Sequence, residues 1–80
     1  MSKYRLLYFA SLRDAAGFDA ETFESSAIDA RSLYDEVAQA RGLRMSPRRI
    51  RVAINGEFVA WEQHLSDGDE VAFLPPVSGG

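Results

Sequence analysis

The chain has 80 residues, of which 46% are hydrophobic and 26% are charged, and its formal net charge is −3. This composition is typical of one small globular domain, and the negative charge argues against a general nucleic-acid binder, whose surface would be basic. The sequence contains no cysteine, which excludes disulfides, thiolate metal ligands and a cysteine nucleophile.

Hydropathy along the chain argues against a membrane partner. No apolar run approaches the length needed to span a bilayer, and residues 1–20 lack the layout of a signal peptide. We therefore expect a cytoplasmic location.

The first third of the chain predicts two strands separated by a short helix. Residues 3–10 are almost continuously apolar and rich in strand formers, which indicates a central strand buried on both faces. Residues 11–17 predict a short helix that Ser11 caps and Gly17 ends. Residues 18–25 predict a second, weaker strand.

The middle of the chain predicts the main helix. Asp29 is a suitable N-cap, Gly42 is a natural residue just past the C-terminus, and Asp35 and Glu36 lie on the side that faces water. The helical spacing of the apolar residues predicts one buried stripe that the stem of an arginine completes. The stripe consists of Ala30, Leu33, Tyr34, Val37, Ala38 and Arg41.

The last third predicts three strands. Residues 50–54 alternate between apolar and other side chains, and Asn55-Gly56 is the strongest hairpin signal in the chain, typical of a type I′ turn. Residues 57–60 are the expected return strand of that hairpin. The last strand is expected at residues 70–74.

The order of these elements favours an α+β fold. One long helix can cover only one face of a sheet, so we expect a β-grasp arrangement, a mixed sheet of about five strands wrapped around one main helix. The first and last strands would then lie side by side in the centre. Residues 1–74 form the expected domain, and residues 75–80 form an extended tail.

The tail is the stretch most suggestive of function. Pro75 and Pro76 cannot donate hydrogen bonds to a sheet, so the chain after Leu74 is expected to leave the sheet in an extended path. Gly79 and Gly80 have no side chains, so a narrow channel could admit them. A frayed terminus is the alternative interpretation.

No catalytic constellation can be assembled from the side chains, and no metal site is expected. His64 is the only histidine and lacks the partners that catalysis needs, while turn geometry accounts for Asp67 and Asp69. Trp61 is expected to pack rather than to stack on a ligand. A solvated edge accounts for a cluster of four arginines at positions 44, 48, 49 and 51.

Any covalent chemistry must therefore use the backbone carboxylate of Gly80. Adenylation would convert this carboxylate into a mixed anhydride, and a sulfur nucleophile could then displace AMP and leave a thiocarboxylate.

Three segments resemble the small subunits of molybdopterin synthase. They are residues 8–17 (YFASLRDAAG), residues 52–55 (VAIN) and, most specifically, residues 65–80 (LSDGDEVAFLPPVSGG). The resemblance runs through most of the chain and is thin between residues 39 and 51. It implies a ubiquitin-like β-grasp fold and a sulfur carrier for molybdenum cofactor synthesis.

The resemblance also implies the partners and the site. The expected partners are the large synthase subunit, in a heterotetramer, an activating enzyme related to ubiquitin-activating enzymes, and a sulfur donor protein. The activating enzyme would use ATP, and this chain would bind no cofactor and supply no catalytic side chain. Gly80 is the expected modified residue with Gly79 as its slim neighbour, and the expected partner-binding residues are Phe9, Phe58, Leu74, Pro75, Pro76 and Val77.

Two other functions stay open at this point. A carrier of the same mechanism could supply sulfur to the thiamine thiazole or to a thiolated tRNA. A chain of a different class would be a ubiquitin-like protein modifier that attaches Gly80 to lysines, or a plain interaction domain.

Overall fold

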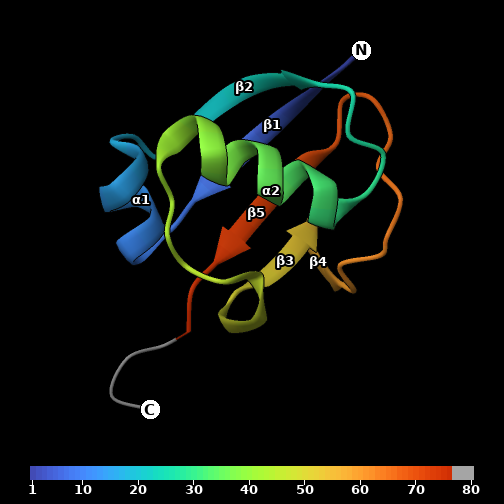
Figure 1. Ribbon diagram of the computed structural model, residues 1–80. Coiled ribbons are helices and arrows are strands. Elements are labelled where there is room, and N and C mark those ends of the chain that lie inside the picture. Colours follow the sequence, from blue (N-terminus) through green and yellow to red (C-terminus); the bar gives the residue numbers. More distant parts are fainter. Residues whose placement is uncertain (77–80) are drawn as a thin grey trace.

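The structure is a computed structural model that describes residues 1–76 (Figure 1). The elements in chain order are β1 (Ser2–Tyr8), α1 (Ala10–Ala16), β2 (Ala20–Ser25), α2 (Ala30–Arg41), the 3₁₀ helix η1 (Pro47–Arg49), β3 (Arg51–Ile54), β4 (Glu57–Val59) and β5 (Glu70–Leu74). The predicted order of strands and helices is confirmed, and η1 is an addition within the connector after α2. None of the helices in residues 1–76 is both long enough and apolar enough to cross a membrane.

The five strands form one mixed sheet in the order β2-β1-β5-β3-β4. The first and last strands lie side by side in parallel, with Leu7 opposite Ala72 and Tyr8 opposite Phe73. The other neighbouring strands pair antiparallel. The predicted α+β β-grasp arrangement is therefore confirmed, including the central position of the two terminal strands.

The predicted start of the short helix is wrong, because Ser11 does not cap it. The N-cap of α1 is Phe9, and no side chain accepts a capping hydrogen bond there. The carbonyl oxygen of Phe9 instead accepts hydrogen bonds from the N–H groups of Leu12 (3.0 Å) and Arg13 (3.3 Å). The first strand consequently ends at Tyr8, two residues before the predicted end. Gly17 ends α1 as predicted, in the left-handed conformation with φ 93°.

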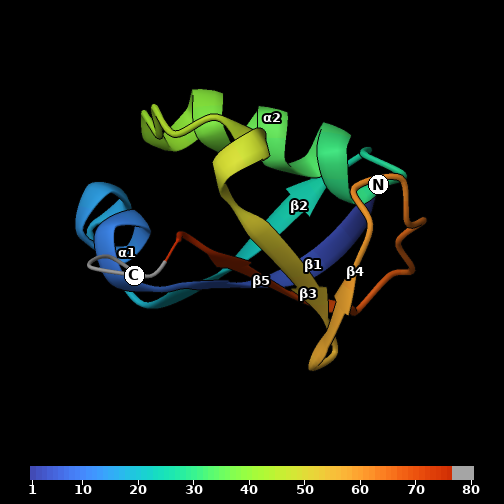
Figure 2. The same ribbon diagram turned by 90° about the horizontal axis from the view of Figure 1, so that it is seen from below.

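Helix α2 lies across one face of the sheet, as Figures 1 and 2 show. The Oδ1 atom of Asp29 accepts a hydrogen bond from the N–H of Ser32 (2.8 Å), so the predicted N-cap is confirmed. Gly42 ends the helix with φ 71°, and the N–H of Leu43 donates to the carbonyl oxygen of Ala38 (2.9 Å). The predicted apolar stripe of α2 faces the sheet, and its buried members are Ala30, Leu33, Tyr34 and Val37.

An aromatic cluster forms the centre of the core between α2 and the sheet. Phe73 of β5 is fully buried, and its ring centroid lies 5.1 Å from that of Tyr34 and 6.4 Å from that of Tyr8. Trp61 stacks on Phe73 with ring centroids 6.4 Å apart, and its ring centroid lies 5.6 Å from that of Tyr34. Trp61 thus packs against the core, as the sequence predicted. The cluster joins the two central strands to the helix through dispersion and apolar burial.

Arg41 does more than complete the stripe of α2, because it joins α2 to β1 and β2 through Glu21. Its guanidinium donates two hydrogen bonds to the Glu21 carboxylate, one of them from Nε at 2.9 Å. The hydroxyl of Tyr8 donates to the same carboxylate. The Glu21 side chain is only 11% exposed, so the hydrogen bonds from these partners must replace those that water would make to the ionised carboxylate.

The surroundings of Glu21 act on its pKa in opposite directions. Burial alone would raise the pKa of the carboxyl group, but the hydrogen bonds from Arg41 and Tyr8 and the positive charge of Arg41 outweigh burial and lower it. A lowered pKa in the folded state means that ionised Glu21 stabilises the fold above its unfolded pKa, whose ordinary value is 4.5. This stabilisation is lost as the pH falls from about that value through the folded pKa.

We predict that Glu21→Gln lowers the free energy of unfolding at pH 7 by about 1–3 kcal/mol, because it weakens charge-assisted hydrogen bonds in a mostly buried site. Urea unfolding measured from pH 7 down to pH 3 should show the difference from the wild type shrinking below about pH 4.5. Glu24→Gln, at an exposed position of the same strand, is the matched control and should change little. An equal effect of the two substitutions at every pH would contradict this role of Glu21.

Candidate functional site

The face of the sheet opposite α2 carries no helix in residues 1–76, as Figure 2 shows. Side chains alternate between the two faces of a strand, and residues directly opposite in register share a face. In β1, Tyr4, Leu6 and Tyr8 are buried on the helix side. The remaining side chains, Lys3, Arg5 and Leu7, therefore lie on the open face.

The register places an apolar patch on this open face. Leu7 lies opposite Ala72, Ala72 lies opposite Ala53, and Ala53 lies opposite Phe58 of the edge strand. Leu74 is two residues beyond Ala72 on the same face. We call these five residues the apolar patch: Leu7, Ala53, Phe58, Ala72 and Leu74.

The exposure of the larger patch residues shows that the patch is a surface rather than a second core, although Ala53 between them is only 8% exposed. Phe58 is 57% exposed, although its ring contacts the guanidinium of Arg51 at 4.3 Å from the ring centroid. Leu7, Ala72 and Leu74 are half-buried. Phe9, which directly follows β1, is 44% exposed. None of the three predicted partner-binding aromatic and aliphatic side chains, Phe9, Phe58 and Leu74, packs in the core.

The chain leaves the sheet beside this patch. β5 ends at Leu74, which lies opposite Arg51, and the half-buried Pro75 and exposed Pro76 follow it outside the sheet. A proline has no N–H to continue a strand, so this end of β5 agrees with the sequence prediction. The predicted site residues Val77, Gly79 and Gly80 lie outside the described residues.

The far end of the open face is charged. Lys3 lies opposite Glu24, and Arg5 lies between Thr22 and Glu70. The open face is thus apolar toward the start of the tail and charged away from it. Sequence reasoning missed Leu7, Ala53 and Ala72 as patch residues, because alternation alone does not say which face the helix covers.

The aspartates near the last turn have the structural roles that the sequence predicted. Oδ1 of Asp67 accepts a hydrogen bond from the N–H of Lys3 (2.7 Å), and Oδ2 of Asp69 accepts one from the N–H of Ser66 (2.8 Å). Oδ1 of Asp69 also accepts from the side-chain amide of Asn55 (3.0 Å). The bond to Asp67 attaches the turn before β5 to β1, and the bonds to Asp69 fix the turn itself and attach the β3–β4 hairpin to it.

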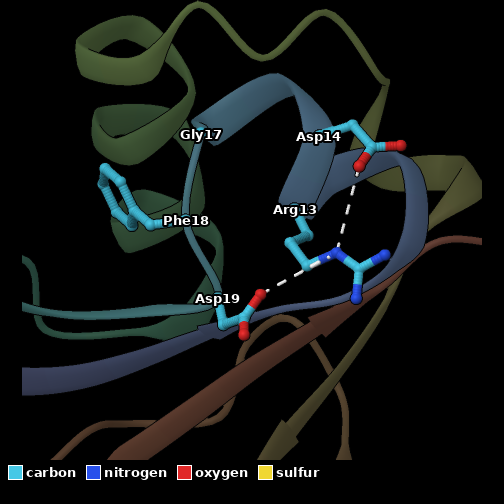
Figure 3. Close-up of a pocket in the computed structure, with 5 residues that line it drawn as sticks. All are labelled: Arg13, Asp14, Gly17, Phe18 and Asp19. Atoms are coloured by element: carbon cyan, nitrogen blue, oxygen red, sulfur yellow. Dashed lines mark ion pairs between the residues drawn. The ribbon is translucent and has the colours of Figure 1, made fainter.

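Two shallow hollows are present in the described surface, and neither forms a catalytic centre. Figure 3 shows the first, of about 350 Å³, where Arg13 lies between Asp14 and Asp19 with Nε to Oδ1 distances of 3.9 and 3.8 Å. All three side chains are largely exposed, so these ion pairs contribute little. The second hollow, of about 310 Å³, includes His64 at its exposed rim.

The described residues also contain no group of three or more side chains that could hold a metal ion. The backbone of His64 pairs with that of Asp29 in an isolated antiparallel β-bridge. The residue is exposed, as expected from the sequence. Within residues 1–76, the open face and the start of the tail are therefore the strongest candidate site, because they combine exposed apolar side chains with the point where the chain leaves the sheet.

Comparison with known proteins identifies the family of the chain. Residues 6–80 match the model of the ThiS family. The molybdopterin synthase sulfur carrier subunit of Escherichia coli is 33% identical over 79 residues, which are 95% of this chain and 98% of that protein.

Solved structures confirm the fold. The crystal structure of SAMP1 from Haloferax volcanii has a TM-score of 0.81 at 26% identity and covers 99% of this chain and 100% of that one. A chain in the complex of subunits 1 and 2 of the molybdopterin-converting factor from Helicobacter pylori has a TM-score of 0.68 at 23% identity. That match covers 98% of this chain and 99% of the other.

We predict that the open face contributes much less to folding than the helix-covered face does. Phe73→Ala should lower the free energy of unfolding by about 3–5 kcal/mol, because it leaves a cavity in the aromatic cluster. Phe58→Ala should lower it by less than about 1 kcal/mol, since the ring is mainly exposed. Urea unfolding of the two variants measures the contrast, and equal losses would show that Phe58 belongs to the core.

Proposed function

The chain belongs to the ThiS family, and from that premise we propose that it is the sulfur carrier subunit of a molybdopterin synthase. Two observations support the proposal: the 33% identity to the molybdopterin synthase sulfur carrier subunit of Escherichia coli, and the point at which the chain leaves the sheet. The chain leaves the centre of the sheet beside an uncovered apolar patch and ends in Gly79-Gly80. A partner bound to the patch would therefore receive the tail.

The proposed chemistry takes place at the carboxylate of Gly80. A carboxylate oxygen attacks the α-phosphorus of ATP, pyrophosphate leaves, and the product is an acyl adenylate. Sulfur at the oxidation level of sulfide then attacks the carbonyl carbon, the C–O bond to AMP breaks, and a thiocarboxylate remains. Its ionised sulfur attacks the pterin precursor and forms a C–S bond to it. Water then cleaves the acyl C–S bond, which regenerates the Gly80 carboxylate and leaves one sulfur on the pterin, so two charged carriers supply the two sulfurs of the dithiolene.

The partners supply what this chain lacks. An activating enzyme related to ubiquitin-activating enzymes would bind ATP, a sulfur donor protein would deliver sulfur, and the large synthase subunit would hold the pterin precursor and the catalytic side chains. Because the activation step consumes ATP, we place the cycle in the cytoplasm.

The apolar patch is the proposed docking surface for the large subunit. An interface core is apolar and poor in charge, and a few large side chains carry most of the binding energy. Leu74 and Phe58 present such side chains next to Pro75 and Pro76, and Phe9 adds an exposed ring at the same end of the sheet. Val77 would follow these residues into the partner.

Two other functions share much of this chemistry: a protein modifier, and a carrier that supplies sulfur to the thiamine thiazole or to a thiolated tRNA. SAMP1, which has the same fold, is named a small archaeal modifier protein in a second crystal structure, and a modifier would also activate its C-terminal carboxylate. A modifier would join Gly80 to an amine and lose water overall, whereas a carrier would exchange oxygen for sulfur and gain about 16 Da. Intact mass after incubation with the activating enzyme, ATP and a sulfur source separates the two. Mixing the thiocarboxylate with the large subunit and pterin precursor then identifies the product.

We predict that the tail tolerates no added width or length. Gly79→Phe, or one alanine added after Gly80, should abolish sulfur transfer because the tail no longer fits a narrow channel, while the thermal unfolding midpoint stays the same. The matched control is one alanine added before Met1, which should leave the mass gain of about 16 Da intact. A tail variant that still transfers sulfur at the wild-type rate would refute the channel model.

A second prediction concerns the patch and the exposed ring of Phe9 beside it. Leu74→Ala and Phe9→Ala should each weaken binding to the large subunit at least tenfold, equivalent to about 1.4 kcal/mol, because each removes a large apolar anchor. Calorimetric titration measures this loss. Ile28→Ala is the matched control, since Ile28 is 67% exposed but precedes α2 rather than lying on the open face. If all three variants bound equally well, another surface would have to hold the large subunit.

A further inference from the structure

The connector between α2 and β3 carries a concentration of positive charge that the proposed function has not used. Four exposed arginines lie within eight residues, and the connector's apolar residues, Leu43, Met45 and Ile50, are buried or half-buried. We call the four exposed arginines the basic ridge: Arg44, Arg48, Arg49 and Arg51.

The connector that presents the ridge is held in place. The hydroxyl of Tyr34 donates to the carbonyl oxygen of Met45 (2.7 Å), which ties the connector to α2. The hydroxyl oxygen of Ser46 accepts from the N–H of Arg48 (3.2 Å), and the N–H of Arg49 donates to the carbonyl oxygen of Ser46 (2.9 Å). Ile50, which is 4% exposed, anchors the far end. A fixed backbone lowers the entropy that the arginines lose when a partner binds.

The ridge has no acidic counterpart in the described part of the chain. The ion pairs found in residues 1–76 involve Arg13, Arg31 and Arg41, and none of them involves a ridge arginine. The whole chain nevertheless has a net charge of −3. The ridge is therefore a local reversal of charge, which fits an acidic protein surface better than a nucleic acid that the rest of the chain would repel.

The ridge also adjoins the proposed interface. Arg51 lies opposite Leu74, the last residue of β5, and its guanidinium lies over the ring of Phe58. Positive charge thus borders the apolar patch at the point where the tail begins. In a protein interface this is the arrangement of a charged rim around an apolar core.

We propose that the basic ridge docks on an acidic surface of the enzyme that activates the tail. This proposal rests on the proposed function. Rim charges mainly raise the rate of encounter, whereas apolar contacts set the lifetime of a complex. A carrier must find its activating enzyme afresh for every turnover and leave it afterwards, and charge at the rim of an interface speeds that encounter without prolonging the complex.

The test is the steady-state rate of thiocarboxylate formation, measured against carrier concentration at low and high ionic strength. Arg48→Glu/Arg49→Glu should raise the KM for the carrier at least tenfold at low salt, with kcat changed by less than twofold. The increase should shrink at high salt, where charges are screened. The kcat/KM of the wild type should itself fall as salt rises, a measurement that needs no variant.

Two further variants control for charge and for folding. Arg48→Lys/Arg49→Lys keeps the charge and should keep the KM within about threefold. Lys3→Glu/Arg31→Glu makes the same change in net charge at exposed positions away from the connector, and it should also leave the KM near the wild-type value. Circular dichroism should show the same thermal unfolding for each variant.

The outcomes distinguish this inference from the function on which it rests. An unchanged KM for Arg48→Glu/Arg49→Glu, or an equal rise with Lys3→Glu/Arg31→Glu, would refute docking through the basic ridge. Formation of the thiocarboxylate in the same assay would still support the sulfur-carrier function. A loss of affinity for the large subunit rather than for the activating enzyme also overturns the proposal. If the wild type forms no thiocarboxylate at all, both the proposed function and the ridge proposal that rests on it are refuted.

Discussion

The parallel pairing of β1 with β5 is the constraint on which the rest of the structure depends. It joins the two ends of the chain in the centre of the sheet, with Leu6 opposite Val71 and Tyr8 opposite Phe73. Parallel neighbours cannot be joined by a tight turn, so everything between them must pack around this pair. The same pairing places the end of β5 at the middle of the sheet rather than at its edge. A tail that starts there is flanked by surface on both sides.

A single long helix then divides the sheet into two unlike faces. α2 buries the aromatic cluster around Phe73 on one face, and the Arg41–Glu21–Tyr8 network fixes the helix to β1 and β2. Nothing in residues 1–76 covers the other face, where alanines at positions 53 and 72 keep the patch flat. The aromatic cluster and the proposed docking surface therefore lie on opposite sides of the same strands. Residues on the open face can vary with the partner at little cost to folding.

The sequence predicted the features that depend on local chemistry. Asn55-Gly56 forms the expected turn with positive φ at both residues, and Asp29 caps α2 through its own side chain. The start of α1 could not be predicted in this way, because the backbone carbonyl of Phe9 closes the first turn and leaves no side-chain signal.

The patch shows a second limit of sequence reasoning. Leu7, Ala53 and Ala72 share a face only through the register of three strands that are far apart in the sequence, and no local pattern encodes that register. The tail, in contrast, could be interpreted directly from its residues. The two prolines restrict the backbone, and the two glycines at the end keep the chain narrow. Both effects are local and need no tertiary information.

The distribution of amines has a consequence for the proposed activation of Gly80, which would turn the C-terminus into an acylating agent. Lys3 is the only lysine in the sequence, and it lies near the start of β1, at the end of the sheet opposite to where β5 ends. Every cationic side chain of the basic ridge is an arginine, whose guanidinium stays protonated and is not nucleophilic at neutral pH. The surface around the tail therefore attracts acidic groups without offering an amine to an activated carbonyl carbon. Acylation of Lys3 by the chain's own terminus is disfavoured because Lys3 lies at the other end of the sheet. Acylation of the ridge arginines is disfavoured because a protonated guanidinium is not nucleophilic.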